Sequence, residues 1–158
     1  MPGGAPTIGM PGKLNRVLLR LLEAALGGAF LYAGLLKHWH PEEFAAAILA
    51  YQILPSGLVG LAAAAVPWLE LTPGSLLILG FKRRSCLLLL ALLAAGFMLL
   101  ILVTMARGLK IDCGCGLFFQ RQVGLAVALE DGLFLAWAAG LYWWELLQAP
   151  GEQVQAAP

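Results

Sequence analysis

The sequence predicts an all-α, polytopic membrane protein, a four transmembrane helix bundle with a short surface helix after the first span. Hydrophobic residues make up 61% of its 158 residues and charged residues only 12%, whereas about 25% are charged in a typical soluble protein. The mean hydropathy is +0.84. Four apolar stretches are long enough, at about 1.5 Å of rise per residue, to cross roughly 30 Å of hydrocarbon. The lipid bilayer is therefore the expected surrounding.

These stretches form one predicted membrane domain over residues 13–147. A Gly- and Pro-rich tail (1–12) precedes it and is expected to be disordered, and a polar tail (148–158) follows it. The first apolar stretch exceeds the roughly 7–15 residues of a signal-peptide core, so a retained span is favoured. The predicted spans cover residues 17–36, 58–79, 86–106 and 123–147.

A shorter helix is expected between the first two spans, over residues 42–54. Pro41 followed by Glu42 and Glu43 is typical of a first helical turn, where proline fits and acids face the positive end of the helix dipole. Phe44 and Tyr51 then recur at helical spacing. The segment is too short to span a bilayer, so the sequence predicts that it lies at the surface.

Four spans place both chain ends on one side of the membrane, and the basic residues favour that side as the cytoplasmic one. Net charge is +1 and the basic residues are scattered, so nothing indicates nucleic-acid binding. The prediction is a multi-pass protein of the cell inner membrane whose loop before the fourth span faces outward. Six basic residues lie on the terminal side (Lys13, Arg16, Arg20, Lys82, Arg83, Arg84) and four on the other (Lys37, Arg107, Lys110, Arg121).

That outward loop contains two of the three cysteines, Cys113 and Cys115. Disulfides persist outside the membrane, and strain makes a bond easier to reduce. Gly114 gives the backbone freedom that such a small ring needs. Lys110 would favour a thiolate and Asp112 would oppose it. A redox-active pair and a structural disulfide both fit these residues.

A metal site is the third interpretation of the thiol pair. Cys113 and Cys115 with His38 and His40 would make a plausible set for Zn²⁺ or Cu(I), although the spacing is tighter than usual. No other cofactor is indicated; a quinone is possible in principle, but no quinone site is identifiable. Cys86 stands alone and is expected to be packed and inert.

Acidic residues inside the apolar stretches are the second unusual feature. Glu70 lies within the second span, where a charge is costly and needs a partner. The expected buried pair is Arg20–Glu70, with Glu23 competing for Arg20 from the i+3 position; it would serve as a structural ion pair or a proton relay. Glu130 and Asp131 are either proton acceptors for thiol chemistry or solvated, if the fourth helix starts later than residue 123.

Several segments along the chain match the pattern of one known family. They are FLYAGLLK at 30–37, Pro41, Phe44, Tyr51, Leu54-Pro55, PWLE at 67–70, Gly74, Gly80 and RGLKIDCGC at 107–115. Together these segments resemble the MauE branch of the MauE/DoxX-like redox-associated membrane proteins, over roughly residues 16–137. Two positions depart from the family pattern: Gly116-Leu117 replaces Phe-Gly, and Glu130 replaces an arginine.

The resemblance implies a four-helix membrane bundle with a role in disulfide formation or thiol transfer outside the membrane. MauE itself is linked to maturation of methylamine dehydrogenase, whose small subunit needs many periplasmic disulfides. The implied partner is a periplasmic thiol–disulfide protein, and the implied activity is that of a thiol–disulfide oxidoreductase. A non-catalytic assembly factor for a periplasmic enzyme is the alternative.

Overall fold

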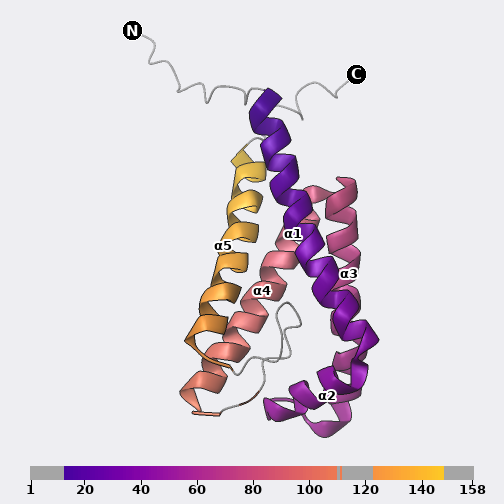
Figure 1. The fold of residues 1–158 in the computed structure, drawn as a ribbon, viewed down its shortest axis with the longest axis vertical. Coiled ribbons are helices and arrows are strands. Elements are labelled where there is room, and N and C mark those ends of the chain that lie inside the picture. The colour runs from indigo at the N-terminus through magenta and orange to yellow at the C-terminus, as the bar shows by residue number, and fades with distance from the viewer. Residues whose placement is uncertain (1–12, 110, 112–122, 148–158) are drawn as a thin grey trace.

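The computed structural model describes residues 13–109, 111 and 123–147, and this part of the chain is helical with no strand. Four of the helices are long and apolar enough to cross a membrane, all except α2. The predicted all-α, polytopic fold is therefore confirmed (Figure 1). The helices are α1 (Lys13–Trp39), α2 (Pro41–Ala50), α3 (Ser56–Leu79), α4 (Arg83–Ala106) and α5 (Leu125–Leu147).

The helix bounds differ from the sequence prediction at several ends. α1 continues to Trp39, three residues beyond the predicted end of its span. α2 stops at Ala50 because Tyr51 caps it and Gln52 takes a left-handed φ of 52°. α5 begins at Leu125, so Glu130 and Asp131 lie inside the helix. The helix thus starts two residues later than predicted, and both acids are half-buried rather than fully solvated. The predicted tails, 1–12 and 148–158, lie outside the described residues.

The bundle is built from two close helix pairs, α1 with α3 and α4 with α5, which are joined through α3 and α4. Apolar side chains from four helices fill the interior, including Leu26, Leu77, Leu90 and Ala138. Large apolar side chains also cover the outside, as expected of a protein whose outer surface meets lipid tails. Exposed examples are Leu21, Leu61, Leu92, Leu99, Leu129 and Leu133.

Glycines bring α1 and α3 into backbone contact. A Cβ placed on Gly27 would lie 2.7 Å from the carbonyl oxygen of Gly74, and one on Gly74 would lie 2.8 Å from that of Gly27. Both distances are too short for any side chain. Membrane helices associate through such small residues, because lipid provides no hydrophobic drive for helix pairing. These contacts fix the register of the antiparallel pair.

The bundle has two distinct ends (Figure 1). The terminal end consists of the start of α1, the connection between α3 and α4, and the end of α5. The loop end consists of the end of α1, α2, the end of α4 and the start of α5. Each end holds its own group of charged side chains.

Candidate functional site

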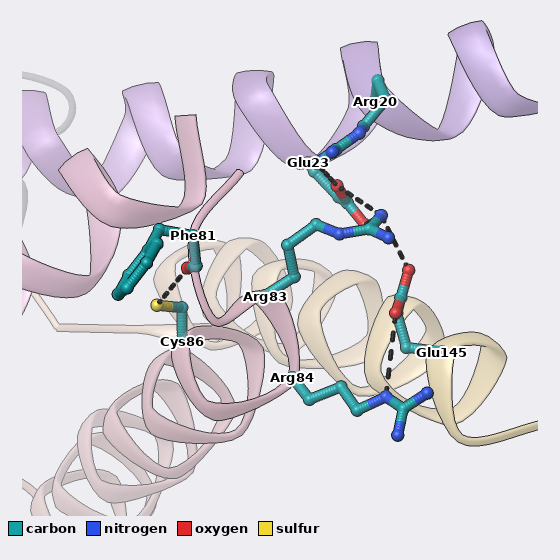
Figure 2. Close-up of polar contacts among 7 residues, drawn as sticks. All are labelled: Arg20, Glu23, Phe81, Arg83, Arg84, Cys86 and Glu145. Carbon is teal, nitrogen blue, oxygen red and sulfur yellow. Dashed lines mark hydrogen bonds and ion pairs between the residues drawn. The ribbon is translucent and has the colours of Figure 1, made fainter. Parts of the chain in front are cut away.

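At the terminal end, ion pairs connect three helices (Figure 2). Glu23 on α1 is only 2% exposed, and its carboxylate lies 3.2 Å from Arg20 Nη1 and 3.1 Å from Arg83 Nη1. Arg83 also lies 2.8 Å from Glu145 Oε1 on α5, and Arg84 is 3.8 Å from the other oxygen of Glu145. The pairing of Arg20 with Glu23, predicted only as a competitor of Arg20–Glu70, is present. This terminal cluster joins α1, α4 and α5.

The predicted Arg20–Glu70 pair is wrong, because Glu70 pairs with Lys37. Lys37 Nζ donates to both carboxylate oxygens of Glu70, at 2.7 and 2.9 Å. The two side chains are 3% and 2% exposed. Arg20 instead lies against Gly80, which is ten residues or about 15 Å along α3 from Glu70.

The helix register explains why Lys37 was missed. Gly34 of α1 packs against Glu70 and Pro67 of α3, so Lys37, one turn further along α1, reaches back to the carboxylate. The sequence prediction ends the first span at residue 36 and counts Lys37 among the basic residues outside the spans, on the side opposite the termini. The sequence does indicate that Glu70 needs a cation nearby, because an acid within a span is costly unless it is paired. Lys37 is that cation, and it lies in the last turn of α1.

Aromatic rings surround the Lys37 ammonium. The ring centroid of Phe44 on α2 lies 5.6 Å from Nζ, and that of Phe97 on α4 lies 5.3 Å from it. Both distances lie within the range of a cation–π interaction. The ion pair therefore contacts side chains of α2 and α4 as well as the two helices that carry it.

Asp131 on α5 lies near this pair. Its Oδ2 is buried and has no hydrogen-bond donor among the described residues. Its charge acts on Lys37 and on Tyr51. Burial, followed by the Asp131 carboxylate, raises the pKa of Tyr51 to about 12. Glu130, its neighbour in α5, is half-buried. Asp131 as a whole is also half-buried, whereas Lys37 and Glu70 are buried.

The segment with the predicted thiol pair connects α4 to α5 at the loop end of the bundle. Lys110, Asp112, Cys113, Gly114 and Cys115 lie outside the described residues. The backbone N–H of Val123 donates to the carbonyl of Ile111, at 2.7 Å. The loop between them is thus closed at its base by a backbone hydrogen bond.

A second contact fixes the end of α4 at the base of the same loop. Arg107, directly after α4, donates to the carbonyl of Tyr51, with Nη1 at 3.0 Å from the oxygen. The residues after α2 and those after α4 are therefore held together.

The histidines proposed as metal ligands are both exposed. The ring of His38 makes an edge contact with that of Trp68, with centroids 5.6 Å apart. His40 Nδ1 lies 3.8 Å from a carboxylate oxygen of Glu43. The described part of the chain contains no group of three potential metal ligands. Cys113 and Cys115, on which the metal interpretation depends, are not among those residues.

Cys86 is buried near the start of α4, at the terminal end. Its thiol is free, and Sγ lies 3.5 Å from the carbonyl oxygen of Phe81, which accepts a weak S–H hydrogen bond (Figure 2). This position fits the expectation of a packed residue at the end of the bundle opposite the Cys113–Cys115 loop.

The fold and the charged groups among the described residues define a polytopic helical membrane protein, with ion pairs that join three helices at the terminal end and a buried Lys37–Glu70 pair between α1 and α3. The family described as methylamine utilisation protein MauE matches this chain over residues 15–144. The chain therefore belongs to the MauE family. No curated protein and no solved structure matches it.

Proposed function

We propose that this chain is a membrane thiol–disulfide component that supports disulfide formation or maturation of extracytoplasmic proteins. Cys113 and Cys115 are its reactive pair. The main support is the Cys-Gly-Cys sequence in a loop whose base is closed by the Ile111–Val123 hydrogen bond. The loop joins two membrane-spanning helices, so its chemistry takes place at the membrane surface.

The proposed reaction is thiol–disulfide exchange with a partner protein that contains a disulfide. The thiolate of one cysteine attacks a sulfur of the partner's disulfide, forms a mixed disulfide and releases the other partner sulfur as a thiolate. The second cysteine then displaces the partner from the mixed disulfide. Cys113 and Cys115 lose two electrons as their disulfide forms, and the partner becomes a dithiol. This sequence donates two electrons to the partner; the reverse sequence takes two electrons from a partner dithiol, which becomes a disulfide, and returns Cys113 and Cys115 to thiols.

Charge distribution supports an orientation with the termini in the cytoplasm and the loop in the periplasm. At the terminal end, the described side chains include five cations and two anions (Arg16, Arg20, Lys82, Arg83, Arg84; Glu23, Glu145). Basic residues flanking spans favour the cytoplasmic side of the inner membrane. A membrane-impermeant maleimide should then label Cys113 and Cys115 in intact cells after reduction. Labelling only after lysis would contradict this orientation.

Alkylation of thiols in native membranes tests the redox proposal. A Cys86→Ala background leaves only Cys113 and Cys115, so every mass shift reports on them. We expect a fraction that alkylates only after reduction, and a mixed disulfide with a partner in either single Cys→Ser variant. Thiols that stay reduced under all conditions would refute the proposal. If the thiols become reactive only after a chelator is added, a metal site is indicated instead.

A non-catalytic assembly factor is the alternative function, and the surface around α2 favours it. Apolar side chains are exposed at Leu49, Ile53 and Leu54, beside the acidic Glu42 and Glu43. Such a surface suits contact with another protein. This alternative predicts that the Cys→Ser variants keep their function, whereas charge reversal at Glu42 and Glu43 abolishes it. If the Cys→Ser variants lose function while the charge-reversal variants keep it, the assembly-factor function is excluded.

A further inference from the structure

We propose that the terminal end of the bundle binds the headgroup of an anionic phospholipid. The binding groups are the cationic side chains of Arg20, Lys82 and Arg84, which lie where the apolar surface of the helices ends. We refer to these three residues as the headgroup site. The site includes neither Cys113 nor Cys115, so it does not depend on the thiol–disulfide function.

The ion pairs of the terminal cluster place carboxylates inside and cations outside. The side chains of Glu23 and Glu145 are 2% and 13% exposed, whereas those of Arg20 and Arg84 are 50% and 42% exposed. The guanidinium group of Arg83 lies between the two carboxylates (Figure 2). The outward face of the terminal cluster is therefore cationic.

The terminal cluster also contains more cations than carboxylates. Oε2 of Glu23 accepts from both Arg20 Nη1 and Arg83 Nη1, at 3.2 and 3.3 Å. Glu145 pairs with the same Arg83 and, at 3.8 Å, with Arg84. Among the described residues, the three arginines of the terminal cluster thus face two carboxylates. One positive charge remains without a matching carboxylate in this cluster.

Lys82 adds a further positive charge beside Arg20. The Arg20 guanidinium lies against Gly80, where a Cβ would be 2.8 Å from Nη1. Lys82 follows two residues later, is exposed, and directly precedes α4. The first turn of α4 contains no acid, so the positive end of its dipole adds to the same charge. An anion bound here meets cationic groups from α1 and from the connection between α3 and α4.

Apolar side chains next to these cations place the headgroup site at the depth of the lipid headgroups. Leu79 and Phe81, on either side of Gly80, are exposed, as is Leu21, which follows Arg20. Such exposed apolar side chains meet acyl chains, while long cationic side chains reach out to the headgroups. A lipid can therefore contact the cations with its phosphate and the apolar side chains with its acyl chains.

The chemistry of the cations favours a lipid with a net negative charge. A guanidinium has five N–H donors in a planar fork that matches the oxygens of a phosphate. Basic groups between membrane helices bind anionic headgroups in this way. A zwitterionic lipid has the same phosphate, but its own ammonium group cancels the charge. The headgroup site should therefore prefer phosphatidylglycerol to phosphatidylcholine.

Binding of these two lipids to the purified full chain in neutral-detergent micelles tests the headgroup site. Each lipid carries the same fluorescent acyl chain, and energy transfer from the tryptophans reports binding. Trp143 and Trp144, both exposed, lie at the terminal end. We expect phosphatidylglycerol to bind at least about fivefold more tightly, since each cation near a headgroup contributes about this factor. Equal binding of the two lipids would overturn the inference.

Charge variants test the residues of the headgroup site. Lys82→Gln should weaken phosphatidylglycerol binding about fivefold, whereas Lys82→Arg should keep the preference. Arg107→Gln removes a cation at the loop end and is the matched control; it should stay within about twofold of the wild type, because screening limits distant charges. Equal losses in Lys82→Gln and Arg107→Gln, or a loss in Lys82→Arg, would overturn the headgroup site.

Two measurements on the wild type separate a lipid from a free anion. Inorganic phosphate should displace no more phosphatidylglycerol than sodium chloride does at the same ionic strength, because phosphate has no acyl chains. Stronger displacement by phosphate would overturn the assignment to a lipid. Phosphatidylglycerol with a photoreactive headgroup should form adducts on peptides that contain residues 79–84. Adducts confined to the loop end would contradict the inference without any variant.

Discussion

The Lys37–Glu70 pair should be a principal source of stability for the contact between α1 and α3. Lys37→Met keeps most of the apolar stem but leaves Glu70 without its cation. Removing one partner of a buried ion pair typically costs about 3–5 kcal/mol. We expect Lys37→Met to cost about 3 kcal/mol, the lower end of this range. Polar groups of membrane proteins also find partners in the unfolded state, which reduces the net contribution of a buried pair.

The assay is reversible unfolding in mixed micelles, followed by circular dichroism, for Lys37→Met, Glu70→Gln and the double variant. Because both side chains are almost fully buried and 2.7 Å apart, the double variant should lose less than the sum of the single losses. We expect a coupling of about 1–3 kcal/mol. Glu43→Gln should stay within about 0.5 kcal/mol, as is usual for surface changes.

Additive losses would refute the argument, since they would show that Lys37 and Glu70 act independently. A loss in Glu43→Gln as large as that in Glu70→Gln would also refute it, because burial would then not be the cause. The same cycle with Arg20→Gln in place of Lys37→Met should be additive, as Arg20 pairs with Glu23 instead.

Three further changes test other contacts by the same unfolding measurement. Gly27→Ala should cost about 1–3 kcal/mol through overpacking. Gly28→Ala, whose added Cβ meets nothing within 4 Å, should be neutral or stabilise by up to ~1 kcal/mol. Equal effects of the two variants would contradict the close contact of the α1 and α3 backbones at Gly27. Glu23→Gln should cost about 1.5–3 kcal/mol and Arg84→Gln less than about 0.5 kcal/mol; the reverse order would be inconsistent with the terminal cluster. Burial raises the pKa of Tyr51 to about 12, above the value of ~10 in the unfolded chain. The stability that the neutral Tyr51 side chain contributes is therefore complete below pH ~10 and declines as the pH rises toward about 12. Tyr51→Phe should flatten that decline. If the free energy of unfolding depends on pH in the same way in Tyr51→Phe and the wild type, Tyr51 is not the group responsible.

The fold was predictable because each span is an apolar stretch close to the length that a bilayer requires. The pairing of Arg20 with Glu23 was equally accessible, since it depends only on i, i+3 spacing within one helix. Both predictions use local information and needed no knowledge of how the helices pack.

The partner of Glu70 was not predictable in the same way. It depends on the register between α1 and α3, which Gly27 and Gly74 set through backbone contact, and on an extension of α1 that brings Lys37 into the helix. The covered position of the Asp131 Oδ2 atom likewise follows from tertiary packing, and the role of Cys113 and Cys115 stays a prediction.

The terminal cluster also bears on the order in which the chain is synthesised. Arg83 and Arg84 leave the ribosome with Lys82 as a compact positive segment, long before Glu145 at the end of α5 exists to pair with them. During insertion, these charges can act as a topology signal. Once α5 has entered the membrane, Glu145 pairs with the same arginines. The residues that guide insertion thus also hold α5 against α4 in the folded protein.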